Sequence, residues 1–301
     1  MSAETKIPSH ITTRTSLVPA INAWRIYLDD QGKSPHTVKA FTADMFLIAS
    51  YLPPDRPLGA ITTNELNNFL EWMQKQRGIP CSPKTLARRI TSIKAFFRWL
   101  VQYGVILIDP AEKVLQQSVI SPLPQVLTPD EFQSVLGIAS EHRHAPVPDA
   151  RYYALLALLL ETGIKKSECL ALSPNHIDLE APTGPILFIR YASPQHRYKE
   201  RKIALSDEWV TAYDEYKQQY QLGDRIFPWS QRRLEYLLED LGEEAGLNKH
   251  LSFEMCRWTC ALSDLTSGME PNKVRQKMGL SKIQWREVKQ KLQKLGGLVP
   301  G

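Results

Sequence analysis

The chain has 301 residues, 43% of them hydrophobic and 23% charged, which excludes a disordered chain and leaves room for two domains with cores of their own. No apolar run approaches the ~20 residues of a membrane span and no signal-peptide pattern opens the sequence, so we expect a cytoplasmic protein without a membrane partner. The net charge of +5 divides into +5 over residues 1–117, −6 over 118–248 and +6 over 249–301, a distribution that suggests a polyanion contacted by both ends.

The first 117 residues predict an all-helical domain of four helices. Their start signals are, in order, the apolar repeat of Ile21, Trp24 and Leu28, Ser34 before Pro35, Thr62 with Glu65 three positions on, and Ser82 before Pro83. A serine or threonine at such a position caps the free N–H groups of the first turn, and proline fits there because it has no N–H to lose. Gly104 closes the fourth helix.

The fourth helix, predicted over Lys84 to Val101, has two distinct faces when its residues are placed at ~100° intervals. Its apolar face consists of Leu86, Ile90, Ile93 and Phe97. The opposite face carries three cations, Lys84, Arg88 and Arg98. On an isolated helix, such a cationic face is most simply explained as a surface exposed to water. Whether it binds a partner must therefore be judged from the rest of the sequence.

A linker is predicted over residues 118–126, where two prolines interrupt a stretch without a helical or strand period. Thr128, Pro129 and Glu131 then open a second domain, 127–301, with the same capping signals. This domain should contain a buried helix from Tyr152 to Leu160 ending near Gly163, a hairpin of strands 186–191 and 201–205, and helices from about 207 onward with breaks near 227–230 and 246–252. The expected fold class is mainly α with a small antiparallel sheet.

Four cysteines, at positions 81, 169, 256 and 260, fit neither a disulfide framework nor a metal site, because only one close pair exists and no histidine cluster completes it. We interpret all four as structural thiols. No acidic residues and histidines have the spacing of metal ligands, so we expect no metal and no other cofactor, and a metal nuclease is disfavoured.

Short motifs follow one another in the order of a known family. They are Ser34 to Ala40, Ser82 to Leu100, Leu127 to Glu131, Thr162-Gly163 with Ser167-Glu168, Lys199-Glu200-Arg201, and Leu251-Ser252 with Arg257, Thr259 and Ala261. From about Leu17 to Lys294 the chain resembles the tyrosine recombinases, the phage-integrase and Xer-type enzymes. The resemblance implies a helical DNA-binding domain followed by a catalytic-type domain, with double-stranded DNA as the partner.

In this family an arginine, a hairpin lysine, a His-x-x-Arg pair and a further histidine or tryptophan surround the scissile phosphate, which a tyrosine attacks without metal. Guanidinium groups suit this task because they bind the charged equatorial oxygens of the transition state through two bonds. Most of the corresponding positions are substituted here: Lys165 for the arginine, His196 for the hairpin lysine, Glu254 for the histidine, Leu280 for the later histidine or tryptophan, and Lys289 for the tyrosine. Of this set only Arg257 is retained.

No neighbouring residue supplies a missing group at the spacing that the family uses. Lys199 and Lys202 are further candidates for the hairpin lysine, and Trp285 lies near the Leu280 position but out of register. No tyrosine follows Tyr236, so the C-terminal part has no phenol that could attack a phosphodiester. The usual chemistry of the family is therefore missing.

Two interpretations of Arg257 are left open. Glu254, three residues earlier on a predicted helix, is placed to form an ion pair with Arg257 and would repel a phosphate. Alternatively, Arg257 still contacts a phosphate. Lys165 and Lys166 equally fit solvated turn residues, and a loop histidine such as His196 is more often a bystander than an acid.

The leading hypothesis is a DNA-binding protein of this family that has lost strand cleavage. A C-shaped clamp on duplex DNA would use Lys39, Lys84, Arg88 and Arg98 in the first domain and Lys273, Arg275, Lys277 and Lys282 near the C-terminus. One alternative is a recombinase subunit that receives a tyrosine in trans from an active homologue. Another is a scaffold for protein partners that no longer binds DNA. An active recombinase or a second copy of the chain is a further expected partner.

Overall fold

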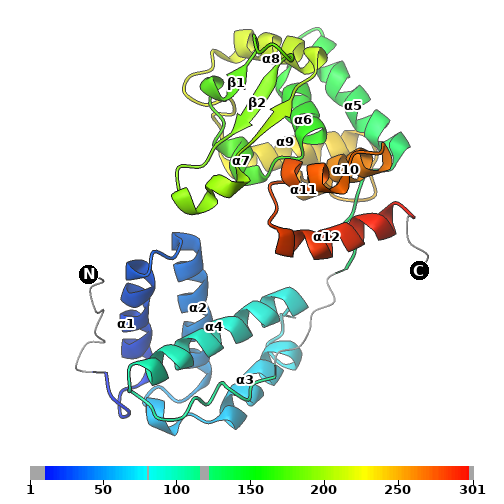
Figure 1. Cartoon of the computed structure of the whole chain (residues 1–301). Helices are drawn as coiled ribbons and strands as arrows, with labels where there is room; N and C mark the ends of the chain where they lie inside the picture. The colour runs from blue at the N-terminus through cyan, green and yellow to red at the C-terminus, as the bar shows by residue number, and fades with distance from the viewer. Residues whose placement is uncertain (1–10, 80, 116–121, 298–301) are drawn as a thin grey trace. The chain divides into compact units, whose positions relative to one another are not determined.

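The computed structural model describes residues 11–79, 81–115 and 122–297 and divides the chain into two compact units, Met1–Ser121 and Pro122–Gly301 (Figure 1). Of the predicted linker, residues 118–121 lie outside the described residues, and 122–126 form neither helix nor strand. Within these described ranges the elements are helices apart from one three-stranded antiparallel sheet, so the predicted fold class is confirmed. No helix within the described ranges is long and apolar enough to cross a bilayer.

The first unit contains α1 (Leu17–Asp30), α2 (Pro35–Tyr51), α3 (Thr63–Lys75) and α4 (Pro83–Gln102), with a short 3-10 helix at Leu58–Ala60. Three of the predicted starts are confirmed by a capping bond, because Ser34, Thr62 and Ser82 each accept the backbone N–H three residues on. At Thr62 the bond is reciprocal, since the Glu65 carboxylate accepts the Thr62 N–H at 2.8 Å. Local sequence therefore determines where these helices begin.

Aromatic residues form much of the core of the first unit. Trp24 of α1 meets Phe96 of α4 edge to face with ring centroids 5.3 Å apart, and Phe96 meets Phe97 at the same separation. The predicted apolar face of α4 is confirmed, because its four residues are at most 4% exposed. With that face packed inward, the opposite side of α4 is available to polar residues.

The second unit is larger. Its helices are α5 (Pro129–His144), α6 (Arg151–Thr162), α7 (Lys166–Leu170), α8 (Asp207–Tyr220), α9 (Gln231–Glu244), α10 (Phe253–Thr266), α11 (Pro271–Lys277) and α12 (Lys282–Leu295). The predicted hairpin is confirmed as β2 (Ile186–Ile189) and β3 (Arg201–Ala204), which pair antiparallel from Ile186 opposite Ala204 to Ile189 opposite Arg201. A two-residue strand, β1 (Ile177–Asp178), pairs with β2 and was not predicted.

Helix α6 lies at the centre of the second unit, and every residue from 153 to 160 is buried. It packs against α5, α8, α9 and α10. As predicted, it ends at Gly163, whose φ of +58° favours glycine. A Cβ at Gly163 would also lie only 3.2 Å from the Cys260 sulfur of α10. This close approach sets the end of α6 against α10, and the candidate site is built around that junction.

Candidate functional site

Glu168 is the centre of the site. It lies on α7, just after the Gly163 turn, and its side chain is 2% exposed. Arg201, at the start of β3, donates to both carboxylate oxygens, from Nη1 to Oε1 at 3.0 Å and from Nη2 to Oε2 at 2.9 Å. The Lys165 N–H donates to the same carboxylate at 2.8 Å, and the Tyr191 hydroxyl also donates to it. One buried carboxylate therefore joins α7 to the hairpin.

These bonds keep Glu168 ionised. Burial alone would raise its pKa, but the bonds from Arg201, the Lys165 N–H and the Tyr191 hydroxyl outweigh burial and lower the pKa to about 2. Burial and the neighbouring carboxylate raise the pKa of Tyr191, so its hydroxyl keeps its proton and acts as a donor. The Glu168–Arg201 pair is therefore fully charged at neutral pH.

Arg201 also reaches the turn that follows α11. Its Nε donates to the Lys277 carbonyl at 2.6 Å. Gly279 adopts a φ of +59°, and a Cβ there would stand 2.8 Å from Arg201 Nη1. A side chain at this position would have to displace the guanidinium, and residues other than glycine rarely adopt this φ. The hairpin and the end of α11 are thus held together beside the Leu280 position.

Arg257, the retained arginine, is bound to backbone carbonyl groups. It lies on α10 with 5% of its surface exposed. Its Nη1 donates to the Gly163 carbonyl and its Nη2 donates to the Met278 carbonyl at 2.5 Å. Burial lowers the pKa of Arg257, and Glu168 is the main opposing charge. Arg257 therefore ties the end of α6 to the end of α11.

Of the two interpretations of Arg257, the ion pair with Glu254 is wrong. Glu254 Oε1 instead accepts from Trp258 Nε1 at 2.7 Å, one helical turn further along α10. The two side chains point in different directions. Trp258, at the i+4 position, is a neighbour of Glu254 on the helix surface, whereas Arg257 points inward to the Gly163 carbonyl. Glu254 nevertheless lines the same cleft as Arg257.

That cleft has a volume of about 220 Å³, and its lining includes two lysines, Lys165 and Lys166. Within the described residues the Lys165 amine forms no hydrogen bond or ion pair, whereas the neighbouring Lys166 binds Glu235 at 2.6 Å. Burial lowers the pKa of Lys165 to about 8; Glu168 opposes this, and the cations Arg257, Lys199 and Arg201 add to it. Lys165 is therefore a cation at neutral pH that loses its proton in mild alkali.

Three residues of the hairpin were considered for the family's lysine. His196 is exposed on the 3-10 helix Pro194–Lys199, with its ring 5.7 Å from that of Tyr191. The Lys202 amine lies 5.1 Å from the centroid of the Phe188 ring. Lys199 is one of the cations that lower the pKa of Lys165, and its amine lies 5.2 Å from the centroid of the Tyr198 ring.

The last two positions of the set lie next to an apolar cluster. Leu280 packs against the cluster, as do Trp285 and Val288 of α12; its buried members are Trp258, Ala261, Val274, Met278 and Leu292. Lys289 is partly buried on α12. A leucine side chain cannot donate a hydrogen bond, and a lysine carries an amine in place of a phenol.

Eight cations were predicted to contact DNA, and five of them are exposed: Lys39, Lys84, Arg98, Lys273 and Lys282. The other three bond within their own unit. Arg88 donates to Asp44, Arg275 donates to Asn272 and to the Leu280 carbonyl, and Lys277 pairs with Asp264 at 2.8 Å with 19% of its side chain exposed. Arg88, Arg275 and Lys277 are therefore already paired within their unit, and their contact with DNA stays a prediction. Helical periodicity does not reveal an acid on a neighbouring helix.

The four cysteines are free thiols. Burial raises the pKa of Cys169, Cys256 and Cys260 well above the ordinary range, so they remain protonated. Across the described ranges, no three histidine, cysteine or acidic side chains are grouped so that they could hold a metal ion.

Two features of the site were not assigned a role from the sequence: the Arg201 bridge and the Tyr191 hydroxyl. Arg201 was recognised only as part of the hairpin motif and Glu168 only as part of the first signature. The available signal was Glu168, a single acid in an otherwise apolar or basic motif. A carboxylate that is buried requires a cationic partner, so its position pointed to a buried ion pair.

The integrase class of proteins has this architecture: one helical unit is followed by a second unit that contains a buried arginine and an antiparallel hairpin. The sequence matches the Phage integrase family over residues 125–287 and the Phage integrase N-terminal SAM-like domain over residues 21–104. The chain therefore belongs to the phage integrase family, that of the Xer-like tyrosine recombinases.

Known relatives support this membership. The chain is 25% identical over 273 residues to the tyrosine recombinase XerD of Listeria innocua, covering 86% of this chain and 89% of that protein. It is 26% identical over 257 residues to XerC of Xylella fastidiosa, covering 84% and 85%.

Solved structures share the fold. The XerH recombinase bound to its difH substrate has a TM-score of 0.72 at 15% identity, covering 97% of this chain and 99% of that chain. The lambda integrase tetramer bound to a Holliday junction also has a TM-score of 0.72, at 16% identity and with 91% and 77% covered.

Proposed function

We propose that this protein binds duplex DNA in recombination or integration without cleaving it. The observation that carries the proposal is Lys289 at the position of the nucleophilic tyrosine. Lys165, Glu254 and Leu280 are substitutions at three further positions of the phosphate site, and the retained Arg257 is bound to backbone carbonyls. Together these changes remove both the attacking group and most donors to the phosphate.

DNA binding is supported by the relatives and by the exposed cations. XerH and lambda integrase are each seen on DNA, the latter as a tetramer, so we also propose that this chain assembles on DNA with copies of itself or with an active recombinase. We assign residues 1–117 as the DNA-binding domain, 118–126 as the linker and 127–301 as the catalytic-type domain. The five exposed cations listed above are distributed over the two units.

Binding should weaken steeply as salt rises. If the five exposed cations alone each neutralise one phosphate, the slope of log affinity against log salt is roughly −4.5, so affinity falls at least about 500-fold between about 50 mM and about 200 mM salt. Filter binding with a labelled duplex at these two concentrations measures it. Affinity that does not change with salt would refute phosphate contacts and favour the protein-scaffold alternative.

Cleavage is tested separately with a nicked suicide substrate, which traps a covalent protein–DNA adduct whenever a nucleophile attacks. We expect no adduct from this chain alone, at any time point. An active homologue can also be added to the reaction. If its tyrosine then becomes linked to DNA that is bound in this chain's site, the result would instead support a subunit that receives its nucleophile in trans.

Lys165 predicts a pH dependence of DNA binding. The cation form binds phosphate, and its pKa is about 8. Affinity should therefore fall, by about tenfold if Lys165 makes one charge-assisted bond, as the pH rises from about 7 to about 9. A Lys165→Arg variant should bind equally well at both pH values, because a guanidinium keeps its charge. An unchanged pH dependence in that variant would show that another group is responsible.

A further inference from the structure

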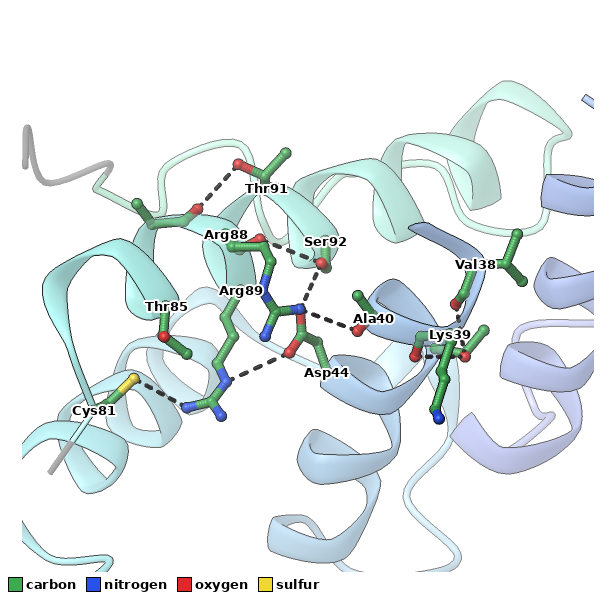
Figure 2. Close-up of polar contacts among 12 residues, drawn as sticks. Val38, Lys39, Ala40, Asp44, Cys81, Thr85, Arg88, Arg89, Thr91 and Ser92 are labelled. Carbon is green, nitrogen blue, oxygen red and sulfur yellow. Dashed lines mark hydrogen bonds and ion pairs between the residues drawn. The ribbon is translucent and has the colours of Figure 1, made fainter. Parts of the chain in front are cut away.

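A buried carboxylate joins α2 to α4 in the first unit (Figure 2). The Asp44 side chain is 4% exposed, and its Oδ2 accepts from the Ser92 hydroxyl at 2.8 Å and from Arg88 Nη1. The Arg89 Nε lies 3.4 Å from its other oxygen. An acid buried to this degree needs such partners, and together they hold it in one orientation.

Arg88 uses only one side of its guanidinium in this network. Its Nη1 donates to Asp44 and also to the Ala40 carbonyl at 3.2 Å, so both hydrogens of that nitrogen bind α2. Within the described residues Nε and Nη2 have no partner, and neither is among the buried unpaired atoms. The side chain is 39% exposed. The Nε–Nη2 edge, which binds phosphate through two parallel bonds, is therefore open to solvent.

Arg89 provides a contrast within the same network. Its side chain is 12% exposed, and its Nη1 donates to the Cys81 sulfur at 3.0 Å, so it points into the unit. Arg88 is the arginine of the two that presents an edge outward. Lys84 lies one turn earlier on α4, exposed and without a partner in the described residues, so the two cations lie on one face at the i, i+4 spacing.

We propose that Asp44 is a positioning residue for DNA binding: it fixes Arg88 so that the Nε–Nη2 edge donates to one phosphate of the duplex backbone. The inference rests on the proposed function. Its physical basis is preorganisation, because an arginine already ordered by folding loses less conformational entropy when it binds phosphate. Asp44 thus assists binding although its own charge repels DNA.

Asp44→Asn separates positioning from simple charge. The variant gains one positive charge, so charge alone predicts tighter binding and a steeper salt dependence. Positioning predicts the opposite: Kd for a short labelled duplex should rise about tenfold, and the salt slope should flatten by up to about one contact. Asp29→Asn is the charge-matched control, because Asp29 is exposed on α1, and its Kd should stay the same or fall slightly.

A double-mutant cycle excludes a merely structural effect. Arg88→Ala should weaken binding about as much as Asp44→Asn, and the double variant should be no weaker than either single one. Should Asp44→Asn fail to fold, Arg88→Lys decides, since lysine keeps the charge but lacks the fork and should bind about as poorly as Arg88→Ala.

The outcomes distinguish the inference from the proposed function. Absence of DNA binding by the natural chain would count against the proposed function itself. If the natural chain binds and a folded Asp44→Asn binds equally or more tightly, or if Arg88→Lys binds like the natural chain, Asp44 does not position Arg88 and the inference is overturned.

Discussion

A Lys289→Tyr variant is expected to bind duplex DNA like the natural chain and still to form no covalent adduct on a nicked suicide substrate. The change restores the nucleophile but not the donors that stabilise charge on the phosphate. Lys165 offers a point charge in place of a planar fork, and Leu280 offers no donor. Glu254 adds a negative charge to the cleft. Each missing donor costs roughly 10²–10³ in rate, so the losses at Glu254 and Leu280 alone hold the reaction at least about 10⁴-fold below that of an active relative.

A fourfold variant tests whether cleavage returns when the donors are restored together with the nucleophile. Adding Lys165→Arg, Glu254→His and Leu280→His to Lys289→Tyr should give an adduct that survives a denaturing gel. The control carries the three donor substitutions with Lys289 unchanged, and it should give no adduct because it lacks the phenol. An adduct from Lys289→Tyr alone would mean that the cleft still activates a phosphate. A fourfold variant that folds and binds DNA but gives no adduct would mean that these positions were assigned incorrectly.

The elements that were predictable from the sequence depend on local interactions. Ser34, Thr62, Ser82 and Thr128 each cap the helix that follows, because the cap and the N–H that it accepts are three residues apart. The hairpin was predictable for a similar reason, since its strands are separated by one loop. The two-residue strand β1 is too short to show a period and is defined by its pairing with β2.

The candidate site was less predictable because its contacts join residues far apart in the sequence. Arg257 binds the Gly163 carbonyl, 94 residues away, although the nearer Glu254 was the partner that spacing favoured. Arg88 and Asp44 are 44 residues apart, so helical periodicity placed Arg88 on a cationic face without revealing the acid that α2 brings to it. Spacing predicts the positions of the family's site, but only the fold shows which charges are already paired.

Glu168→Gln is expected to lower the free energy of unfolding of the second unit by about 3 kcal/mol at neutral pH. The pKa of Glu168 is about 2 in the fold against an ordinary value of 4.5, and each pKa unit corresponds to about 1.4 kcal/mol. Because the folded pKa is the lower one, the ionised carboxylate stabilises the fold above about pH 4.5, and this contribution is lost as the pH falls towards about 2. Urea denaturation at about pH 7 and about pH 3 measures both the loss of stability and its dependence on pH. The natural chain and the Glu168→Gln variant should differ less at the lower pH.

Two comparison variants separate the buried pair from charge removal in general. Glu235→Gln breaks the Lys166–Glu235 pair, whose side chains are 35% and 38% exposed, and should cost less than about 1 kcal/mol because water screens it. Arg201→Met removes the guanidinium and leaves the buried Glu168 carboxylate without its cation, so it should cost about 3–5 kcal/mol. A loss in Glu168→Gln no larger than in Glu235→Gln, or equal at both pH values, would show that the Glu168–Arg201 bridge does not hold α7 to the hairpin.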